Sequence, residues 1–406
     1  MGGLDHGGRW RRVACTAVLA VLAGACGARG DEGDAAVASP AAPPQPLVLG
    51  VAVAQSGVAA PYGQEQLAGA QLAERLLNDG GGIAGRPIQL VVSDTGDEAG
   101  GAVSAFQELI NTHPVVGIIG PTRAEQAAAA HPVAEQSQVP TLGLSATPED
   151  GSAGGEYVTG VSAPITATAP RAIDGALAQG PVERAAVAFA EDDPFSTAEA
   201  VAFQRLLRDR GVPLAAVETF QAGDADLGGE AVVILGADPQ LVVISGLGAS
   251  GVSLARALRE RGYQGRIVGG VGFDTAEVFS ACGPACQGVL TAQAYSPATV
   301  GEIAEAFRTA FEQEQGRPPQ QLSAQAFTAV QVFVEALQAV EAAVGLDGLD
   351  LVSLRTELND AVLAGEYETP LGRIRLSPDG IDQESFHLAQ IEMDADGRTG
   401  RFSFPQ

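Results

Sequence analysis

The sequence predicts an α/β protein with two doubly wound lobes, each built on a parallel sheet. Short β-branched or leucine-rich runs alternate with longer segments of helical periodicity along most of the chain. This alternation occurs twice, once over residues 47–147 and again over residues 184–270. The chain also has 406 residues, which is too many for one compact core.

The first round opens with strand, helix, strand and helix. We expect strands at Leu47–Ala54 and Ile88–Ser93, and a helix over Gly63–Asn78 that the glycines at 80–82 stop. A second helix is marked by apolar residues at helical spacing, namely Val103, Phe106, Leu109 and Ile110. These units predict the first half of a doubly wound sheet.

The round continues in a βαβ unit with strands at Val115–Ile119 and Val139–Leu144 around an Ala-rich helix. Small-residue loops follow the two strands, at Gly120–Arg123 and Ser145–Thr147. Ligands of open parallel sheets lie at the carboxyl ends of the strands, so both loops should share one rim. The first loop opens a helix, whose N-terminus favours an anionic group such as a carboxylate.

The second round starts after Ala163-Pro164. Four strands alternate with three helices, in the order Arg184–Ala190, Ser196–Arg210, Leu214–Thr219, Glu230–Ala237, Leu241–Ser245, Gly251–Arg261 and Arg266–Gly270. A strand at Gly288–Ala294 then precedes three helices without sheet partners of their own, at Gly301–Gln315, Gln321–Val344 and Leu351–Leu363. The tail contains strands at Arg373–Leu376 and Phe386–Glu392.

The N-terminus has the pattern of an export signal. Three arginines precede the apolar run Val13–Leu22, which is short for a membrane span, and small residues lead to Cys26. This resembles a bacterial lipobox, so we predict a signal peptide over residues 1–25 and an acylated Cys26 at a membrane-anchored N-terminus. An ordinary secretory signal is the alternative. Residues 27–46 read as a disordered linker rich in Gly, Ala and Pro.

Composition restricts the partners. The formal net charge is −26, which argues against nucleic acid or an anionic membrane surface as a partner bound by charge. All 23 basic residues are arginines, so lysine chemistry is excluded. Outside the signal the cysteines are Cys26 and the pair Cys282 and Cys286, which export should oxidise to a disulfide. A redox role is the weaker alternative, because the spacing exceeds that of Cys-x-x-Cys.

The motif IIGP at residues 118–121, the Ala-rich helix after it and the run VPTLGLSATP at residues 139–148 resemble the leucine/isoleucine/valine-binding protein family. These are type I periplasmic binding proteins that serve ABC importers. The resemblance covers residue 47 to the C-terminus and implies a three-stranded hinge that crosses near Ala163–Ile165, Ala294–Pro297 and Thr369–Gly372. It gives an N-lobe of residues 47–164 and 296–370, and a C-lobe of residues 165–295 and 371–406.

The resemblance also implies a small ligand in the cleft between the lobes. In the first lobe the matching positions are Tyr62, Thr122, Arg123, Ala124, Ser145, Ala146 and Thr147. Among these, Ser145 and Thr147 are expected to hold the polar head group, and Arg123 suits a carboxylate. Capping or turn formation is the alternative role for the two hydroxyls.

In the second lobe the matching positions are Phe195, Leu247, Val271 and Asp274. Val271 stands where relatives carry the acid that pairs with an amino acid's ammonium group. Either Asp274, Asp192 or Glu125 replaces that acid, or the ligand is not an amino acid, since a buried unpaired ammonium is costly.

One motif favours a different function. Residues 246–251 form G-x-G-x-x-G after a strand and before a helix, with Asp274 about twenty residues on, as in dinucleotide-binding folds. Export argues against a nicotinamide cofactor, and the four scattered histidines give no catalytic constellation. The acidic run at residues 191–193 reads as a solvated loop, with metal binding as its alternative.

We therefore expect a monomeric solute-binding lipoprotein that docks on an ABC permease and needs no cofactor or metal. A sensor of the same fold is the runner-up, and an exported dinucleotide-binding enzyme is the remaining alternative.

Overall fold

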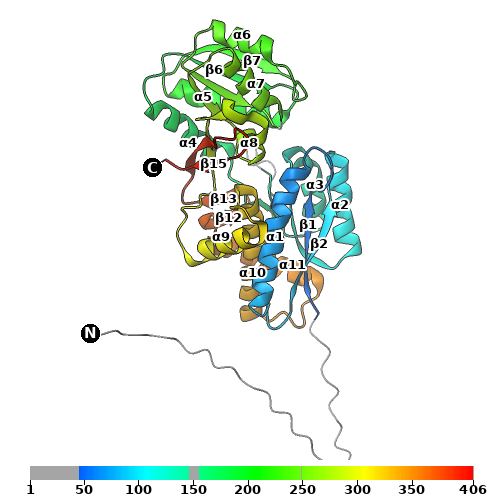
Figure 1. Cartoon of the computed structure of the whole chain (residues 1–406). Helices are drawn as coiled ribbons and strands as arrows, with labels where there is room; N and C mark the ends of the chain where they lie inside the picture. The colour runs from blue at the N-terminus through cyan, green and yellow to red at the C-terminus, as the bar shows by residue number, and fades with distance from the viewer. Residues whose placement is uncertain (1–44, 146–154, 248, 406) are drawn as a thin grey trace, which may run out of the picture. The chain divides into compact units, whose positions relative to one another are not determined.

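The structure is a computed structural model that describes residues 45–145, 155–247 and 249–405 (Figure 1). The predictions made for Cys26, Ala146 and Thr147 fall outside these residues. The strands form sheets of five, seven and three strands. The first two sheets are the centres of the predicted lobes, and the third was not expected.

The five-stranded sheet has the order β2-β1-β3-β4-β5, and all of its pairings are parallel. Its strands are β1 (Leu47–Val53), β2 (Ile88–Asp94), β3 (Val115–Ile119), β4 (Thr141–Gly143) and β5 (Val158–Gly160). Strands β1 and β3 are buried along their whole length, which explains their uninterrupted apolar sequences.

Six helices cover this sheet: α1 (Ala60–Asp79), α2 (Ala99–Thr112), α3 (Ala124–Gln136), α9 (Glu302–Gln315), α10 (Gln321–Ala343) and α11 (Leu351–Ala364). Alternate residues of β1 face two different cores. Leu49 and Val51 belong to the core that α1, α10 and α11 share, whereas Val48 and Ala52 belong to the core that includes Phe106 of α2. The sheet is therefore covered on both faces, and the late helices return to the first lobe as predicted.

Helices α1 and α10 lie side by side (Figure 1). A Cβ atom added at Gly69 of α1 would lie 2.0 Å from the carbonyl oxygen of Ser323 in α10, so the two backbones meet at this glycine. Of the helices in the described part of the chain, α10 passes a length and hydropathy test for a membrane span, but 67% of the tested window is buried inside the protein. This is the behaviour of a core helix.

The seven-stranded sheet has the order β15-β14-β10-β9-β8-β6-β7. Its strands are β6 (Ala185–Ala190), β7 (Leu214–Phe220), β8 (Leu241–Ser245), β9 (Arg266–Gly269), β10 (Leu290–Gln293), β14 (His387–Met393) and β15 (Gly400–Ser403). The strands from β7 to β10 pair in parallel, and β14 and β15 extend the β10 edge antiparallel. The predicted strand at Phe386–Glu392 therefore joins the second lobe as expected.

Helices again cover both faces. One core contains α4 (Ile165–Ala178) and α5 (Pro194–Asp209), and the other contains α6 (Gly228–Gly236), α7 (Ala249–Glu260) and α8 (Glu277–Cys282). Two short 3₁₀ turns, η1 (Val271–Phe273) and η2 (Gly283–Cys286), follow β9 and α8. A disulfide joins Cys282 to Cys286 across η2.

The placement of residues 371–383 in the second lobe was wrong. They belong to a three-stranded antiparallel sheet of β11 (Glu366–Thr369), β12 (Gly372–Ser377) and β13 (Gly380–Gln383). Thr369 pairs with Gly372, so the segment that we took for a hinge crossing is a hairpin turn. Ile374 and Leu376 are buried in the same core as α10 and α11, and the third crossing lies after β13.

Candidate ligand-binding site at the strand ends

The loop after β3 is shaped by close backbone packing. Gly120 has a φ of +126°, and a Cβ atom there would lie 2.0 Å from the carbonyl oxygen of Ala52 in β1. No other residue fits this position without displacing β1. The loop is thus pressed against the end of β1 before α3 begins at Ala124.

Thr122 uses its hydroxyl group within the protein. Its Oγ1 atom accepts the backbone N–H of Ala54 at 3.0 Å and donates to Oε1 of Gln66 at 2.7 Å. The hydroxyl proton is therefore committed, and a ligand could only donate to the remaining lone pair. The sequence placed Thr122 at the site but gave no sign of this bond.

Gln66 is a candidate site residue that the sequence did not point to. It is buried in α1, one turn after Tyr62, and its Nε2 atom has no hydrogen-bond partner among the described residues. A buried amide donor without a partner costs free energy until an acceptor arrives. The spacing of four residues from Tyr62 was the available signal.

Arg123 brings a positive charge to the same loop. Its guanidinium pairs with Glu125 at 2.5 Å, so Glu125 is occupied by this pair. The Nε atom of Arg123 is buried and has no partner within the described ranges. Ser145 follows β4 on the neighbouring strand end and is buried as well. The two loops therefore lie on one rim, as the parallel order predicts.

The apolar predictions come together. Phe195 belongs to the core of α4 and α5, and Leu247, Val271 and Ala124 pack against that same core. Ala124 is the first residue of α3, a helix of the first lobe that contacts α5 of the second lobe. Phe195 and the three residues that pack against its core are called the apolar wall below.

Asp193 fixes the start of α5. Its Oδ2 atom accepts the backbone N–H of Ser196 at 2.8 Å and the Ser196 hydroxyl at 2.5 Å, which makes it the N-cap of the helix. Phe195 is thereby held in the first turn. Asp192 accepts the backbone N–H of Ala222 in an exposed position.

Two carboxyl groups are buried behind this wall. Glu199 of α5 lies 2.5 Å from the Oγ atom of Ser245 and accepts the backbone N–H of Val271 at 2.9 Å. Burial raises the pKa of Glu199 to about 7, and the negative charge of Asp193 acts in the same direction. Glu199 was not predicted, although an acid between Phe195 and Phe203 on the buried face of α5 is visible in the sequence.

Asp274 forms a hydrogen bond near the predicted hinge. Its Oδ2 atom accepts the side-chain amide of Gln321 at 2.8 Å, and Gln320 next to it accepts the backbone N–H of Ala276 at 2.8 Å. Burial raises the pKa of Asp274 well above its usual range, and ionisation of Glu199 would act in the same direction. The structure thus ties this predicted ligand contact to the first turn of α10.

A family model described as periplasmic binding protein matches residues 46–398. The chain belongs to this family. A leucine-, isoleucine-, valine-, threonine- and alanine-binding protein of Pseudomonas aeruginosa is 24% identical to this periplasmic binding protein, over 84% of this chain and 88% of its own length. In Brucella relatives named Leu/Ile/Val-binding protein homologues, the match spans only 56% to 66% of their length.

Solved structures share the fold. A branched-chain amino acid substrate-binding protein of Streptococcus pneumoniae, in complex with isoleucine, has a TM-score of 0.75 at 21% identity and covers 89% of this chain and 100% of its own. A solute-binding protein of Rhodopseudomonas palustris, in complex with benzoate, has a TM-score of 0.75 at 22% identity and covers 88% and 96%. The predicted family and the α/β fold with parallel-sheet lobes are confirmed.

The glycine motif of this periplasmic binding protein has a packing explanation. A Cβ atom at Gly246 would lie 3.0 Å from the ring of Phe220, and one at Gly251 would lie 2.9 Å from the carbonyl oxygen of Gly246. These glycines are needed for the close approach of β8, α7 and their neighbours, whether or not a phosphate binds. The described residues contain no group of three or more potential metal ligands from His, Cys, Asp and Glu.

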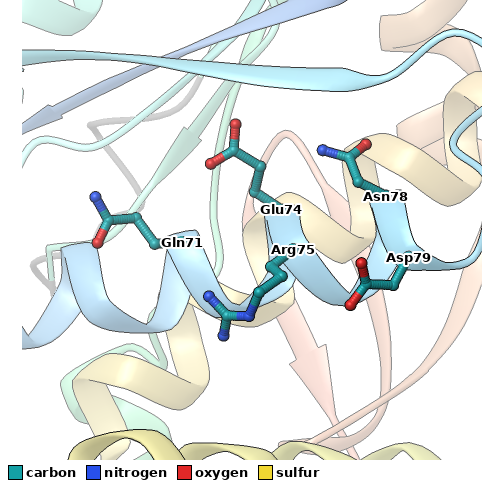
Figure 2. A pocket seen from close by; sticks show the side chains of 5 residues that line it. All are labelled: Gln71, Glu74, Arg75, Asn78 and Asp79. Atoms are coloured by element: carbon teal, nitrogen blue, oxygen red, sulfur yellow. The ribbon is translucent and has the colours of Figure 1, made fainter.

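A surface hollow of about 440 Å³ lies away from the strand ends, along one face of α1 (Figure 2). It is lined by Gln71, Glu74, Arg75, Asn78 and Asp79. Asn78 bonds both the N–H and the carbonyl of Ile88, and Glu74 accepts the N–H of Leu90, both on edge strand β2. Two of the residues that line the hollow therefore form hydrogen bonds with backbone groups of the edge strand, which would otherwise be unpaired.

Proposed function

We propose that this periplasmic binding protein is the extracytoplasmic receptor of an ABC importer. Its ligand is a branched-chain amino acid or a related small carboxylate, held between the strand ends of the two sheets. The observation that carries the proposal is the apolar wall, together with Arg123 at the start of α3 and the buried amide of Gln66 in α1, which has no hydrogen-bond partner among the described residues. The proteins of the same fold that were solved in complex with isoleucine and with benzoate support the same ligand class.

The chemistry divides between the two halves of the site. The guanidinium of Arg123 and the N-terminus of α3 attract the carboxylate, and the amide of Gln66 donates a hydrogen bond to it. The apolar portion of the ligand packs on Phe195, Leu247 and Val271. A ligand of the wrong shape or polarity leaves the buried donors unpaired, and this is the source of specificity.

Ligand-dependent thermal unfolding tests the proposal. The protein is unfolded and refolded to remove carried-over ligand, and then heated with leucine, isoleucine, valine or benzoate. Binding to the native state stabilises it by about 2.7 kcal/mol at a hundredfold excess over the dissociation constant, which raises the unfolding midpoint. Unchanged midpoints across amino acids and small carboxylates would contradict the proposal.

Arg123→Gln sharpens the test. Loss of a charge-assisted hydrogen bond should weaken carboxylate binding about tenfold or more. Arg184→Gln is the matched control, since Arg184 also pairs with a neighbouring carboxylate but lies at the amino end of β6. Equal effects of the two variants would remove Arg123 from the site.

We propose in addition that Cys26 is acylated and anchors the protein through the linker of residues 27–46. Fractionation of cells tests this anchor. The unaltered protein should sediment with membranes, and Cys26→Ala should release it or stop its processing. A soluble unaltered protein with a processed N-terminus would support the ordinary secretory signal instead.

A further inference from the structure

Glu199 touches all three segments that carry the second half of the apolar wall. It lies one helical turn after Phe195 in α5. Its carboxyl group contacts Ser245, two residues before Leu247, and the backbone N–H of Val271. A Cβ atom at Gly270 would lie 1.9 Å from Oε2, so glycine at this position makes room for the carboxyl group. Glu199 thus occupies the point where β8, β9 and α5 converge.

The hydrogen bonds around the Glu199 carboxyl group indicate its protonation state. The Oγ atom of Ser245 lies 2.5 Å from Oε2 of Glu199 and 3.0 Å from the carbonyl oxygen of Ser196. The serine has one proton and the carbonyl can only accept. An ionised Glu199 would leave two acceptors facing each other at one of these contacts.

A protonated Glu199 satisfies every group. Its O–H donates to Ser245, the Ser245 hydroxyl donates to the Ser196 carbonyl, and the second carboxyl oxygen accepts the N–H of Val271. The geometry therefore matches a neutral carboxylic acid. It does not match the counter-ion of a bound ammonium group.

The nearby charges act in the same direction. Asp193 at the start of α5 and Asp274 after β9 interact electrostatically with Glu199, and both are acids. The strands β6 and β8 carry no ionisable residue. The other ionisable groups on or next to elements that contact α5 are the Arg123–Glu125 pair, His131 and Glu135 at α3, the Asp174–Arg210 pair, Arg171 of α4 and Glu218 of β7. The opposite charges within each of the two pairs offset one another.

We propose that Glu199 is a positioning residue of the ligand site that acts as a neutral acid, and that its ionisation loosens the wall and weakens ligand binding. This inference rests on the proposed function. The carboxyl proton links the loop that carries Leu247 to α5, and the carbonyl oxygen of the same group holds Val271. After deprotonation, the Glu199 carboxylate and the Ser196 carbonyl compete for the single hydroxyl proton of Ser245. The apolar wall is then no longer held in one arrangement.

Titration calorimetry with leucine and with benzoate at several values of pH tests the proposal. Neither ligand changes its net charge between pH 5.5 and 8.5. Affinity should be constant below pH 7 and should fall above it, approaching about tenfold per pH unit, because one proton must be regained for binding. Glu199→Gln should keep the low-pH affinity throughout, since a carboxamide can donate to Ser245 and accept from Val271.

Two further variants separate positioning from general effects of charge. Glu218→Gln removes one acid from the neighbouring strand β7 and should retain the pH profile of the unaltered protein. Glu199→Asp keeps the acid but shortens it, so affinity should fall at every pH. A profile for Glu199→Gln that matches the unaltered protein would overturn the proposal.

A ligand-free measurement distinguishes failure of this inference from failure of the proposed function. Infrared difference spectra between pH 5.5 and 8.5 should contain the carbonyl stretch of a buried carboxylic acid that is lost with rising pH. Glu199→Gln should lack this band. If neither ligand binds but the band is present, the ligand class is wrong and the neutral acid stands. If ligand binds but the band is absent, the neutral acid is refuted.

Discussion

The contact between Gly117 and Phe333 couples the strand that leads into the site to the core helix behind it. Gly117 is the central residue of β3, and Phe333 is a fully buried residue of α10. A Cβ atom at Gly117 would lie 2.8 Å from Cζ of Phe333 and 3.0 Å from Cε1. Gly117→Ala therefore forces the ring to move in a core that α1, α10 and α11 share.

The magnitude follows from two opposing contributions. Overpacking of this kind costs about 1–3 kcal/mol, and the loss of glycine freedom in the unfolded chain returns about 0.4–1 kcal/mol. The net loss of stability should be about 1–2 kcal/mol. Phe333→Leu alone should cost about 1 kcal/mol or more through lost ring contacts.

Leucine leaves free the space that the distal ring atoms filled, and the new methyl group of Gly117→Ala can enter it. The double variant should therefore be at least about 1 kcal/mol more stable than the sum of the single effects predicts. Urea unfolding of the four proteins without ligand measures this coupling energy. Additive effects, with no coupling, would refute the packing argument.

Three other changes test separate features. Burial raises the pKa of Glu199 from 4.5 to about 7, so the folded state binds the proton more tightly. The stabilisation that Glu199 contributes is fully present below about pH 4.5 and is lost as the pH rises to about 7. Above that pH the stability no longer depends on this group, and the total loss approaches roughly 3 kcal/mol. Urea denaturation at pH 5 and pH 8 should show that Glu199→Gln lacks this loss of stability. An equal loss between the two pH values in the variant and the unaltered protein would contradict the prediction. Asn78→Ala should cost about 1–2 kcal/mol and increase light scattering on heating, because it frees the edge groups of Ile88. Unchanged scattering would show that another group protects the edge. Replacement of Cys282 and Cys286 by alanine should cost about 2 kcal/mol, given the short loop that they close, and reductant should then have no further effect on the unfolding midpoint.

The sheet architecture could be predicted because it depends on local pattern. The continuous apolar runs of β1 and β3 indicated strands buried on both faces, and the structure places helices on both sides. The strand-end loops were located by the same pattern. Ala124, Phe195 and Val271 were instead expected from the resemblance to the leucine/isoleucine/valine-binding proteins, and in the structure they belong to or pack against one core.

The prediction errors arise where contacts between residues far apart in the sequence determine the structure. The turn at residues 369–372 looks the same in sequence whether the chain reverses into a hairpin or crosses to another lobe. Helix α4 was missed, and it contains Pro170 in its interior. The bonds from Thr122 to Gln66 and from Asp274 to Gln321 join residues 56 and 47 positions apart, so no local pattern announces them.

The order in which the chain fills its cores bears on how the protein is made. One core of the five-stranded sheet, which α1, α10 and α11 share, draws on residues from Leu47 to Ile381, and one core of the seven-stranded sheet includes Ile391 of β14. These two cores are complete only when almost the entire chain has been made, and contacts between such distant segments form slowly. The part of the fold that depends on these two cores is therefore expected to be completed late, when the last strands of the chain become available.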